Sequence, residues 1–162
     1  MEQRAGSAYV RLIMRIALAS DHAAVALKDQ LVAWLTSEGH EVRDLGTHGD
    51  DRVDYPDFGY LLGQAIATGA TDRGIALCGS GIGISIAMNR NPAVRCALVS
   101  EPLSAALARE HNDANAIALG GRLIGIDMAK ACVTAFLSTD FAGGRHGPRV
   151  AKLTDVPQEV TS

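Results

Sequence analysis

The sequence has few of the residues that mark extracellular, membrane-spanning or zinc-binding proteins. It contains three cysteines in 162 residues, so at least one is unpaired under any disulfide scheme. No CxxC motif or His/Cys pair has the spacing of a structural zinc site. No apolar run approaches the ~20 residues that a helix needs to cross a bilayer, and the first residues lack the pattern of a signal peptide. We therefore expect a cytoplasmic protein with no metal and no membrane contact.

An excess of charge of one sign is also missing. The net charge is −3, with 20% charged and 48% hydrophobic residues, which is ordinary for a globular domain and argues against a general nucleic-acid binder. The length fits one domain with a substantial core. Because Met14 directly precedes the first strong apolar run, we divide the chain into an N-terminal extension, residues 1–13, and a domain, residues 14–162.

Short apolar runs alternate with segments of helical periodicity. The predicted strands are residues 15–20, 41–46, 74–78, 95–99 and 116–119. Helical spacing is clearest for Leu27, Leu31 and Leu35. After a polar loop, Pro56 is expected to hold Tyr55 in an extended conformation, and Asp57 to cap a helix that buries Leu61. The tail ends in a short amphipathic segment. This alternation predicts an α/β fold with a doubly wound sheet of about five parallel strands.

A glycine-rich loop follows the third predicted strand, which ends in Cys78. The loop reads Gly79-Ser80-Gly81-Ile82-Gly83. Backbone N–H groups at such a junction favour an anion or a developing oxyanion, and a thiol held against positive potential can act as base or nucleophile. The loop lacks the lysine of a Walker A motif and the spacing of a dinucleotide fingerprint, so a small anion fits better. The alternatives are a tight turn that needs glycine only for backbone geometry, and a buried structural cysteine.

Polar clusters lie at or just beyond the ends of the predicted strands. They are Asp21-His22, Tyr55, Cys78 to Gly83, Ser100-Glu101 and residues 111–122. We expect them to gather at the carboxyl edge of the sheet, where such folds bind ligands. For Asp21-His22 and His111-Asn112, a helix cap and an ordinary turn remain alternatives.

A cationic cluster follows Gly143-Gly144 near the end of the chain. It consists of Arg145, His146 and Arg149. A solvated tail is one explanation. A phosphate clamp is the other, because arginine forks match phosphate oxygens bidentately. Arg122, which follows paired glycines, is a further candidate for such a clamp.

Together these motifs resemble those of the ribose-5-phosphate isomerase B family, which also includes galactose-6-phosphate isomerase subunits. The resemblance extends from about Met14 to Leu153. It is carried by Ser20-Asp21-His22-Ala23, Asp54-Tyr55-Pro56, residues 78–87, Ser100-Glu101-Pro102, residues 109–115 and Gly143-Gly144-Arg145-His146.

The resemblance implies a Rossmann-like fold and a homodimer or tetramer whose active site is shared between two subunits. It implies interconversion of ribose 5-phosphate and ribulose 5-phosphate through an enediolate, without a cofactor. Cys78 matches the base that moves a proton between C1 and C2. His111 matches the acid/base that opens the sugar ring, and the Ser80 hydroxyl is placed to relay a proton between oxygens.

The remaining matched positions bind substrate in the family. Contacts to sugar hydroxyls are implied for Asp21, Tyr55 and Asn112. The phosphate site is implied for His22, Arg122, Arg145 and Arg149, some of them contributed by the neighbouring subunit. Backbone N–H groups of Gly79, Gly81, Ile82 and Gly83 are placed to stabilise the enediolate.

Two positions depart from the family pattern. Leu103 stands where an aromatic residue is expected, and Ala24 stands where glycine is common. Leu103 leaves open another phosphosugar, a hexose 6-phosphate or a tetrose 4-phosphate, as substrate. A non-catalytic phosphosugar-binding module is a further alternative, against which the retention of Cys78 and His111 speaks, because a pure binder needs neither group.

Overall fold

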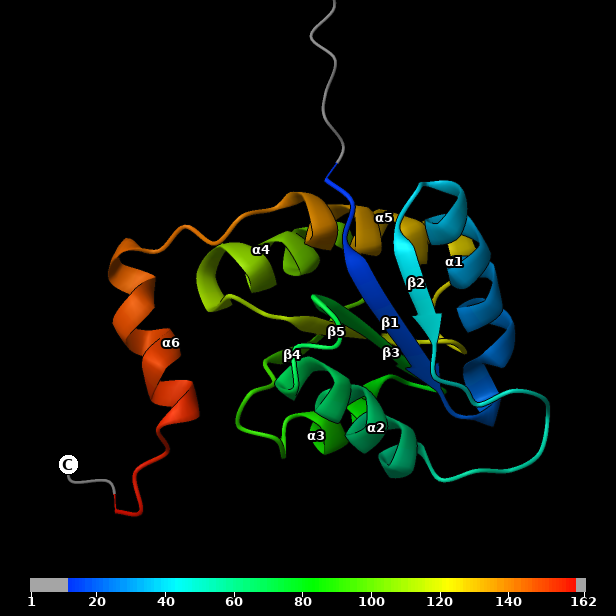
Figure 1. The fold of residues 1–162 in the computed structure, drawn as a ribbon, viewed down its shortest axis with the longest axis horizontal. Helices are drawn as coiled ribbons and strands as arrows, with labels where there is room; N and C mark the ends of the chain where they lie inside the picture. Colours follow the sequence, from blue (N-terminus) through cyan, green and yellow to red (C-terminus); the bar gives the residue numbers. More distant parts are fainter. Residues whose placement is uncertain (1–11, 160–162) are drawn as a thin grey trace, which may run out of the picture.

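Five parallel strands form one sheet in the order β2-β1-β3-β5-β4 (Figure 1). Their bounds are Arg15–Ser20 (β1), Glu41–Asp44 (β2), Arg73–Cys78 (β3), Cys96–Leu98 (β4) and Ala116–Gly120 (β5). This computed structural model describes residues 12–159. The doubly wound α/β fold is confirmed, whereas residues 1–11 of the predicted N-terminal extension lie outside the described residues.

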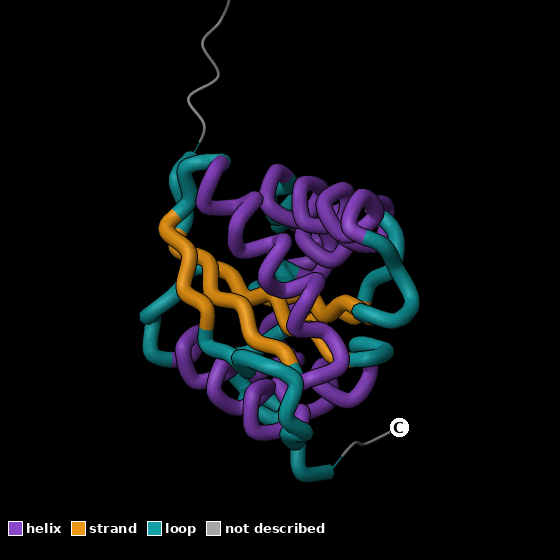
Figure 2. Tube along the Cα trace, turned by 90° about the vertical axis from the view of Figure 1, so that its right-hand side faces the viewer, coloured by secondary structure: helices purple, strands orange, loops and turns teal. Residues whose placement is uncertain are grey.

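Helices cover both faces of the sheet, three on one side and two on the other (Figure 2). Helices α1, α4 and α5 cover one face, and α2 and α3 cover the other. The helical elements are η1 (His22–Ala24), α1 (Val25–Ser37), α2 (Tyr55–Ala67), α3 (Ile82–Met88), α4 (Pro102–Asn112), α5 (Ile126–Ser138), η2 (Gly144–His146) and α6 (Gly147–Thr154).

The core lies on both sides of the central strands. Strands β1, β3 and β5 are buried almost throughout, as expected for parallel strands covered on both faces. Leu31 and Phe136 pack against one face, and Leu62, Ile84 and Met88 against the other. Each such side chain contributes roughly 1.5–3 kcal/mol by leaving water, which holds the sheet edges in a fixed geometry.

Helix α2 differs from the sequence prediction at its start and on its buried face. Asp54, not Asp57, is the N-cap residue, and Tyr55 is helical rather than extended. Proline is tolerated in a first turn because its missing N–H has no acceptor there. Leu61 is 44% exposed. Gly59 is buried instead, because α2 approaches α3 so closely that a methyl group at Gly59 would lie 3.0 Å from Ala87 Cβ.

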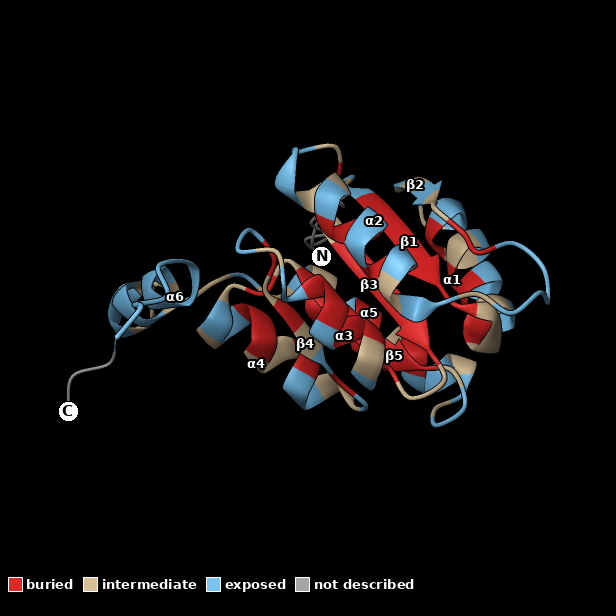
Figure 3. Ribbon diagram, turned by 90° about the horizontal axis from the view of Figure 1, so that it is seen from below, coloured by how far each residue is buried: buried red, intermediate tan, exposed pale blue. Residues whose placement is uncertain are grey.

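Helix α6 stands away from the body of the domain (Figures 1 and 3). None of its residues is buried. It carries the predicted amphipathic segment, with Leu153 53% exposed. The backbone N–H of Ala142, before the arm, donates to Glu110 O at 3.0 Å. We call residues 143–154 the C-terminal arm. Among the described residues, no helix is long and apolar enough to cross a membrane.

Candidate active site

Cys78 ends β3 and is 4% exposed, with its thiol turned into the glycine loop. The Gly81 N–H donates to Cys78 Sγ at 3.2 Å, and the Ile82 N–H donates to Ser80 Oγ at 3.2 Å. Gly81 has φ 77°, a left-handed conformation that favours glycine, and it is the N-cap of α3. The glycine loop therefore turns back onto the end of β3 and places the Gly81 N–H against the sulfur.

Two further side chains border the glycine loop. A methyl group at Gly83 would come within 2.6 Å of the Tyr55 ring, so this ring lies directly over Gly83. A methyl group at Gly79 would lie 3.5 Å from Nη1 of Arg122. The Arg122 backbone N–H also donates to Gly79 O at 3.0 Å. Among the described residues, the Arg122 guanidinium has no carboxylate partner, which leaves its charge available to an anion.

Asp21 and His22 join this group from the end of β1. The Asp21 carboxylate accepts the Ala23 N–H at 3.0 Å, so the helix-cap interpretation of this residue is confirmed. Its backbone N–H donates to Leu77 O on β3 at 3.2 Å, which places Asp21 beside the strand that carries Cys78. His22 Nδ1 accepts the Val53 N–H at 3.3 Å, which fixes the orientation of the imidazole ring. We call the following residues the thiol half-site: Asp21, His22, Tyr55, residues 78–83 and Arg122.

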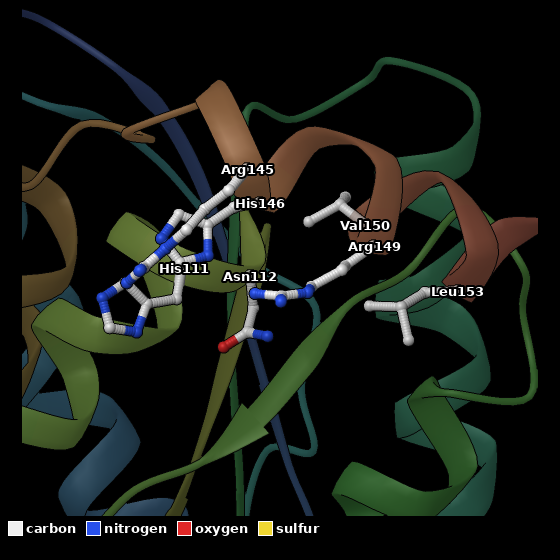
Figure 4. Close-up of a pocket in the computed structure, with 7 residues that line it drawn as sticks. All are labelled: His111, Asn112, Arg145, His146, Arg149, Val150 and Leu153. Atoms are coloured by element: carbon white, nitrogen blue, oxygen red, sulfur yellow. The ribbon is translucent and has the colours of Figure 1, made fainter.

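A second group surrounds a pocket of about 400 Å³ between the end of α4 and the C-terminal arm (Figure 4). Its lining residues are His111, Asn112, Arg145, His146, Arg149, Val150 and Leu153. The rings of His111 and His146 stack, with centroids 4.5 Å apart and planes 14° from parallel. Neither Arg145 nor Arg149 has an ion-pair partner within the described part of the chain. We call this group the imidazole half-site.

Charge in the imidazole half-site is dominated by cations. Partial burial, together with the nearby charges of His111, Arg145 and Arg149, lowers the pKa of His146 below its usual value. Glu110 Oε1 lies 3.8 Å from Nε2 of His111 and is the nearest carboxylate to that ring. A neutral His146 beside two unpaired guanidinium groups leaves a surface that attracts a dianion such as a phosphate ester.

The two half-sites lie at opposite edges of the sheet. Asp113 to Asn115 follow His111-Asn112 and bond to the starts of strands: Asn115 O accepts the Gly74 N–H, and its side-chain oxygen accepts the Arg95 N–H. The expectation that all five polar clusters gather at the carboxyl edge is therefore wrong for His111-Asn112. Helix α4 runs back along the sheet, so its last residues reach the amino ends of β4 and β5.

One more of the polar clusters has a structural role in the fold. The Glu101 carboxylate accepts the N–H groups of Leu103 and Ser104, so Ser100-Glu101 forms a helix cap. These bonds, chiefly from Ser104, hold the pKa of Glu101 below its usual value. The sequence placed His146 in the cationic cluster with Arg145 and Arg149 but did not predict that its ring stacks on His111. The described residues contain no cluster of three His, Cys, Asp or Glu side chains suited to a metal.

Comparison with known proteins decides what kind of protein carries this geometry. The family model for ribose/galactose isomerases matches residues 16–153. The chain is 44% identical to ribose-5-phosphate isomerase B of Escherichia coli over 144 residues, 89% of this chain and 97% of the relative. The chain belongs to the ribose/galactose isomerase family. It is accordingly an aldose–ketose sugar-phosphate isomerase, as the enzyme prediction had it.

Other members of the ribose/galactose isomerase family agree with the fold and extend the substrate range. A ribose-5-phosphate isomerase structure from Thermotoga maritima is 48% identical, with a TM-score of 0.87, and the match covers 88% of this chain and 99% of that one. A D-erythrulose-4-phosphate isomerase of Pectobacterium atrosepticum is 39% identical over 143 residues, 87% of this chain and 93% of the relative.

Proposed function

We propose that this isomerase interconverts ribose 5-phosphate and ribulose 5-phosphate, with Cys78 as the base, at a site that two copies of the chain assemble. The observation that carries this proposal is the separation of the half-sites. A thiol in a glycine loop lies at one edge of the sheet. An imidazole beside two unpaired arginines lies at the other. One sugar phosphate needs both sets, so a second copy must bring the imidazole half-site of one chain to the thiol half-site of another.

Exposed apolar side chains support association of two copies. Ile82 and Ile86 on α3 are 50% and 52% exposed, and Leu98 on the edge strand β4 is 45% exposed. Helix α6 has eight residues and no buried one, and an isolated helix of that length is not stable in water. A partner that covers Leu153 and α3 would remove this apolar surface from water and fix the arm. A homodimer is the simplest such assembly, because isologous contacts close on themselves.

Ring opening is assigned to His111. Ribose 5-phosphate enters as a closed hemiacetal, and the C1–O4 bond must break as the C1 hydroxyl loses its proton and O4 gains one. An imidazole is suited to both transfers, because its ordinary pKa lies near neutral pH. Glu110 Oε1 lies 3.8 Å from Nε2 of the same ring. Asn112, the next residue in the pocket, is placed to hold a sugar hydroxyl.

Proton transfer between C2 and C1 is assigned to Cys78. The thiolate removes the C2 proton, the electron pair forms the C1–C2 double bond, and O1 becomes the enediolate oxygen. Ser80 relays the proton from O2 to O1, and Cys78 returns its proton to C1, which leaves the ketone at C2. Backbone N–H groups of Gly79 to Gly83 would stabilise the negative charge that develops on the enediolate oxygen. This effect is worth about 3–4 kcal/mol for each well-placed donor. Asp21 and Tyr55 would fix the sugar hydroxyls beside them.

The phosphate is assigned to the unpaired cations of both half-sites. Arg122 and His22 would contact it from the chain that supplies Cys78, and Arg145 and Arg149 from the partner copy. Arginine suits this task because its fork binds two phosphate oxygens at once. The remote phosphate then contributes binding energy that positions the reacting carbons.

A substrate panel tests the proposed activity. Purified protein is assayed with four-, five- and six-carbon aldose phosphates, and kcat/KM is compared. We expect kcat/KM to be higher with ribose 5-phosphate than with the four- and six-carbon phosphates. Equal or better turnover of a six-carbon phosphate would contradict the pentose assignment while leaving the reaction type intact.

Isomerisation of a four-carbon phosphate is the second candidate, and Leu103 favours it. This side chain is 66% exposed in the first turn of α4, where the family pattern has an aromatic residue. The 39% identity to an erythrulose-phosphate isomerase supports the same reading. A tetrose 4-phosphate cannot close a furanose ring, because its O4 is esterified. Such a substrate would need Cys78 but not His111, so a His111→Asn variant that retains full activity would favour this candidate.

A reducing, cytoplasmic location fits the proposed function. All three cysteines are free and buried, and none forms a disulfide among the described residues. Burial raises the pKa of Cys96 to about 12, so this thiol is inert at neutral pH.

A further inference from the structure

We propose that Lys28 is a positioning residue for the thiol half-site. It holds the loop after β2 against the end of β1 and thereby places Asp21 and His22. The inference rests on the proposed function, because it assigns Asp21 and His22 to substrate binding. Lys28 itself touches no part of the half-site.

The burial of Lys28 is the first observation. Its side chain is 0% exposed, although it lies on α1 between the core residues Leu27 and Leu31. Its Nζ bonds to Asp29 Oδ1 and to Asp44 Oδ2, both at 2.7 Å. Asp29 belongs to the same helix, whereas Asp44 is the last residue of β2. The ammonium group therefore joins α1 to the end of β2, and Figure 1 shows these two elements side by side.

A continuous series of hydrogen bonds leads from Lys28 to the end of β1. The second oxygen of Asp44, Oδ1, accepts the Gly46 N–H at 2.9 Å. The carbonyl oxygen of Gly46 accepts the Ser20 N–H at 2.6 Å, and the Thr47 N–H donates to Ser20 O at 2.8 Å. Ser20 is followed directly by Asp21 and His22. The Lys28 ammonium group thus fixes the Asp44 carboxylate, and this carboxylate fixes the turn at Gly46. The turn then fixes Ser20, the residue before Asp21 and His22.

The same loop contacts the half-site a second time. Farther along it, the Val53 N–H donates to His22 Nδ1 at 3.3 Å and sets the orientation of the imidazole. Two residues later, Tyr55 begins α2 and lies over Gly83. A shift of the loop at Gly46 would therefore displace His22 and Tyr55 as well as Asp21.

Stability alone does not account for a lysine at this place. Replacing a buried ion pair by apolar side chains is often neutral or stabilising, because desolvation of the charges costs about as much as their attraction returns. A leucine or methionine at position 28 would fill the core among Leu27 and Leu31, and the Asp44 side chain, 24% exposed, would keep contact with water. What an apolar side chain lacks is a directed bond to Asp44, and this bond defines where the loop sits.

The test measures substrate affinity in a Lys28→Met variant, which keeps the length of the side chain and removes the ammonium group. We expect KM for ribose 5-phosphate to rise about fivefold to tenfold, the effect of about one lost hydrogen bond. The inhibition constant of inorganic phosphate should rise by a similar factor, and kcat should stay within about threefold. Asp44→Ala should give the same pattern, and the double variant should be no worse than either single one, because both act through one series of bonds.

Two controls separate positioning from a loss of stability or charge. Leu31→Val weakens the core of the same helix, and Lys130→Met removes a cation from α5 that lies over the Trp34 ring. Both should leave KM unchanged. If Lys28→Met does not fold, Asp44→Ala alone carries the test from the other end of the series.

The outcomes distinguish this inference from the proposed function. A wild-type protein without isomerase activity on the panel would overturn the proposed function. An active wild type with unchanged KM and phosphate inhibition in Lys28→Met, or with additive effects in the double variant, would overturn the assignment of Lys28.

Discussion

The thiol half-site and the imidazole half-site are built in opposite ways. The first lies at the buried carboxyl edge, where β1, β3 and β5 end and the Gly81 and Ile82 N–H groups turn inward. The second lies between the end of α4 and the exposed C-terminal arm. In the proposed mechanism, the group that would take the C2 proton lies on the buried side. The groups that would bind phosphate together with a second copy lie on the exposed side.

This difference is the basis of our proposal that two copies of the chain complete one site. Helix α6 has no buried residue, and we expect a partner copy to cover it. Substitutions in the thiol half-site should therefore act on the chemical step or on packing within one chain. Substitutions of the arm arginines, Arg145 and Arg149, should act on substrate affinity and leave the fold unchanged, whereas substitution of His111 should act on ring opening.

Cys78→Ala should have the largest effect. Without the thiol, no group is placed to take the C2 proton, and we expect kcat to fall by at least about 10³-fold, within the range of a lost acid–base group. Inorganic phosphate should inhibit or bind as in the wild type, because the cations remain. Steady-state assay and phosphate competition measure both quantities. Turnover near the wild-type value would remove Cys78 from its role as base.

Arg149→Ala should have the next largest effect, on affinity rather than on rate. A bond to a charged group is worth about 1.5–3 kcal/mol, so KM should rise about tenfold or more while kcat changes less. Because the side chain is exposed and unpaired, the melting temperature should not change. Arg90→Ala is a matched control, since Arg90 is an exposed arginine after α3 that lies outside both half-sites. Equal effects of the two variants would argue against a phosphate clamp on the arm.

Gly83→Ala should disturb the thiol half-site through packing alone. The added methyl group would meet the Tyr55 ring at 2.6 Å and push it from the loop. Overpacking typically costs about 1–3 kcal/mol, and we expect about a tenfold loss in kcat/KM. Gly125→Ala is the control, because a methyl group there meets nothing within 4 Å. An unchanged kcat/KM for Gly83→Ala would mean that the Tyr55 ring does not need its place over the loop.

The pH response of the arm should be the smallest effect. His146 has a lowered pKa in the folded state, so the folded chain binds this proton more weakly than the unfolded chain does. Its neutral form stabilises the arm above the ordinary histidine pKa of about 6.5, and this contribution is lost as the pH falls below that value. Amide hydrogen exchange of residues 143–154, corrected for intrinsic rates, should speed up between pH 7.5 and 5.5. His146→Phe should abolish that change.

Much of the fold could be predicted from the sequence because buried strands and helix faces require apolar residues at regular spacings. Continuous apolar runs predicted β1, β3 and β5, and the spacing of Leu27, Leu31 and Leu35 predicted α1. The start of α2 was predicted wrongly. Asp54 and Asp57 are both plausible caps, and the choice depends on how Tyr55 packs over Gly83, a contact between distant segments.

The structure divides the predicted site residues between two half-sites, and the sequence did not predict which edge of the sheet each group occupies. Motif similarity brought together Cys78 and His111, and only the topology shows that they lie at opposite edges. A signal was present in the sequence, because His111 comes shortly before β5 and must therefore lie near its amino end. Lys28 left no such signal. A lysine between leucines usually lies at the surface, and its burial depends on Asp44 from a different strand.

Subunit hybrids test the shared site most directly. Cys78→Ala and His111→Asn proteins, each nearly inactive, are mixed, unfolded and refolded together, with each variant refolded alone as control. Half of randomly formed dimers are hybrids, and each hybrid has one site with both groups intact. Because half of the dimers then have one of their two sites intact, we predict recovery of about a quarter of the wild-type activity. Recovery of no activity, although native mass spectrometry detects the hybrids, would show that Cys78 and His111 do not meet across two copies.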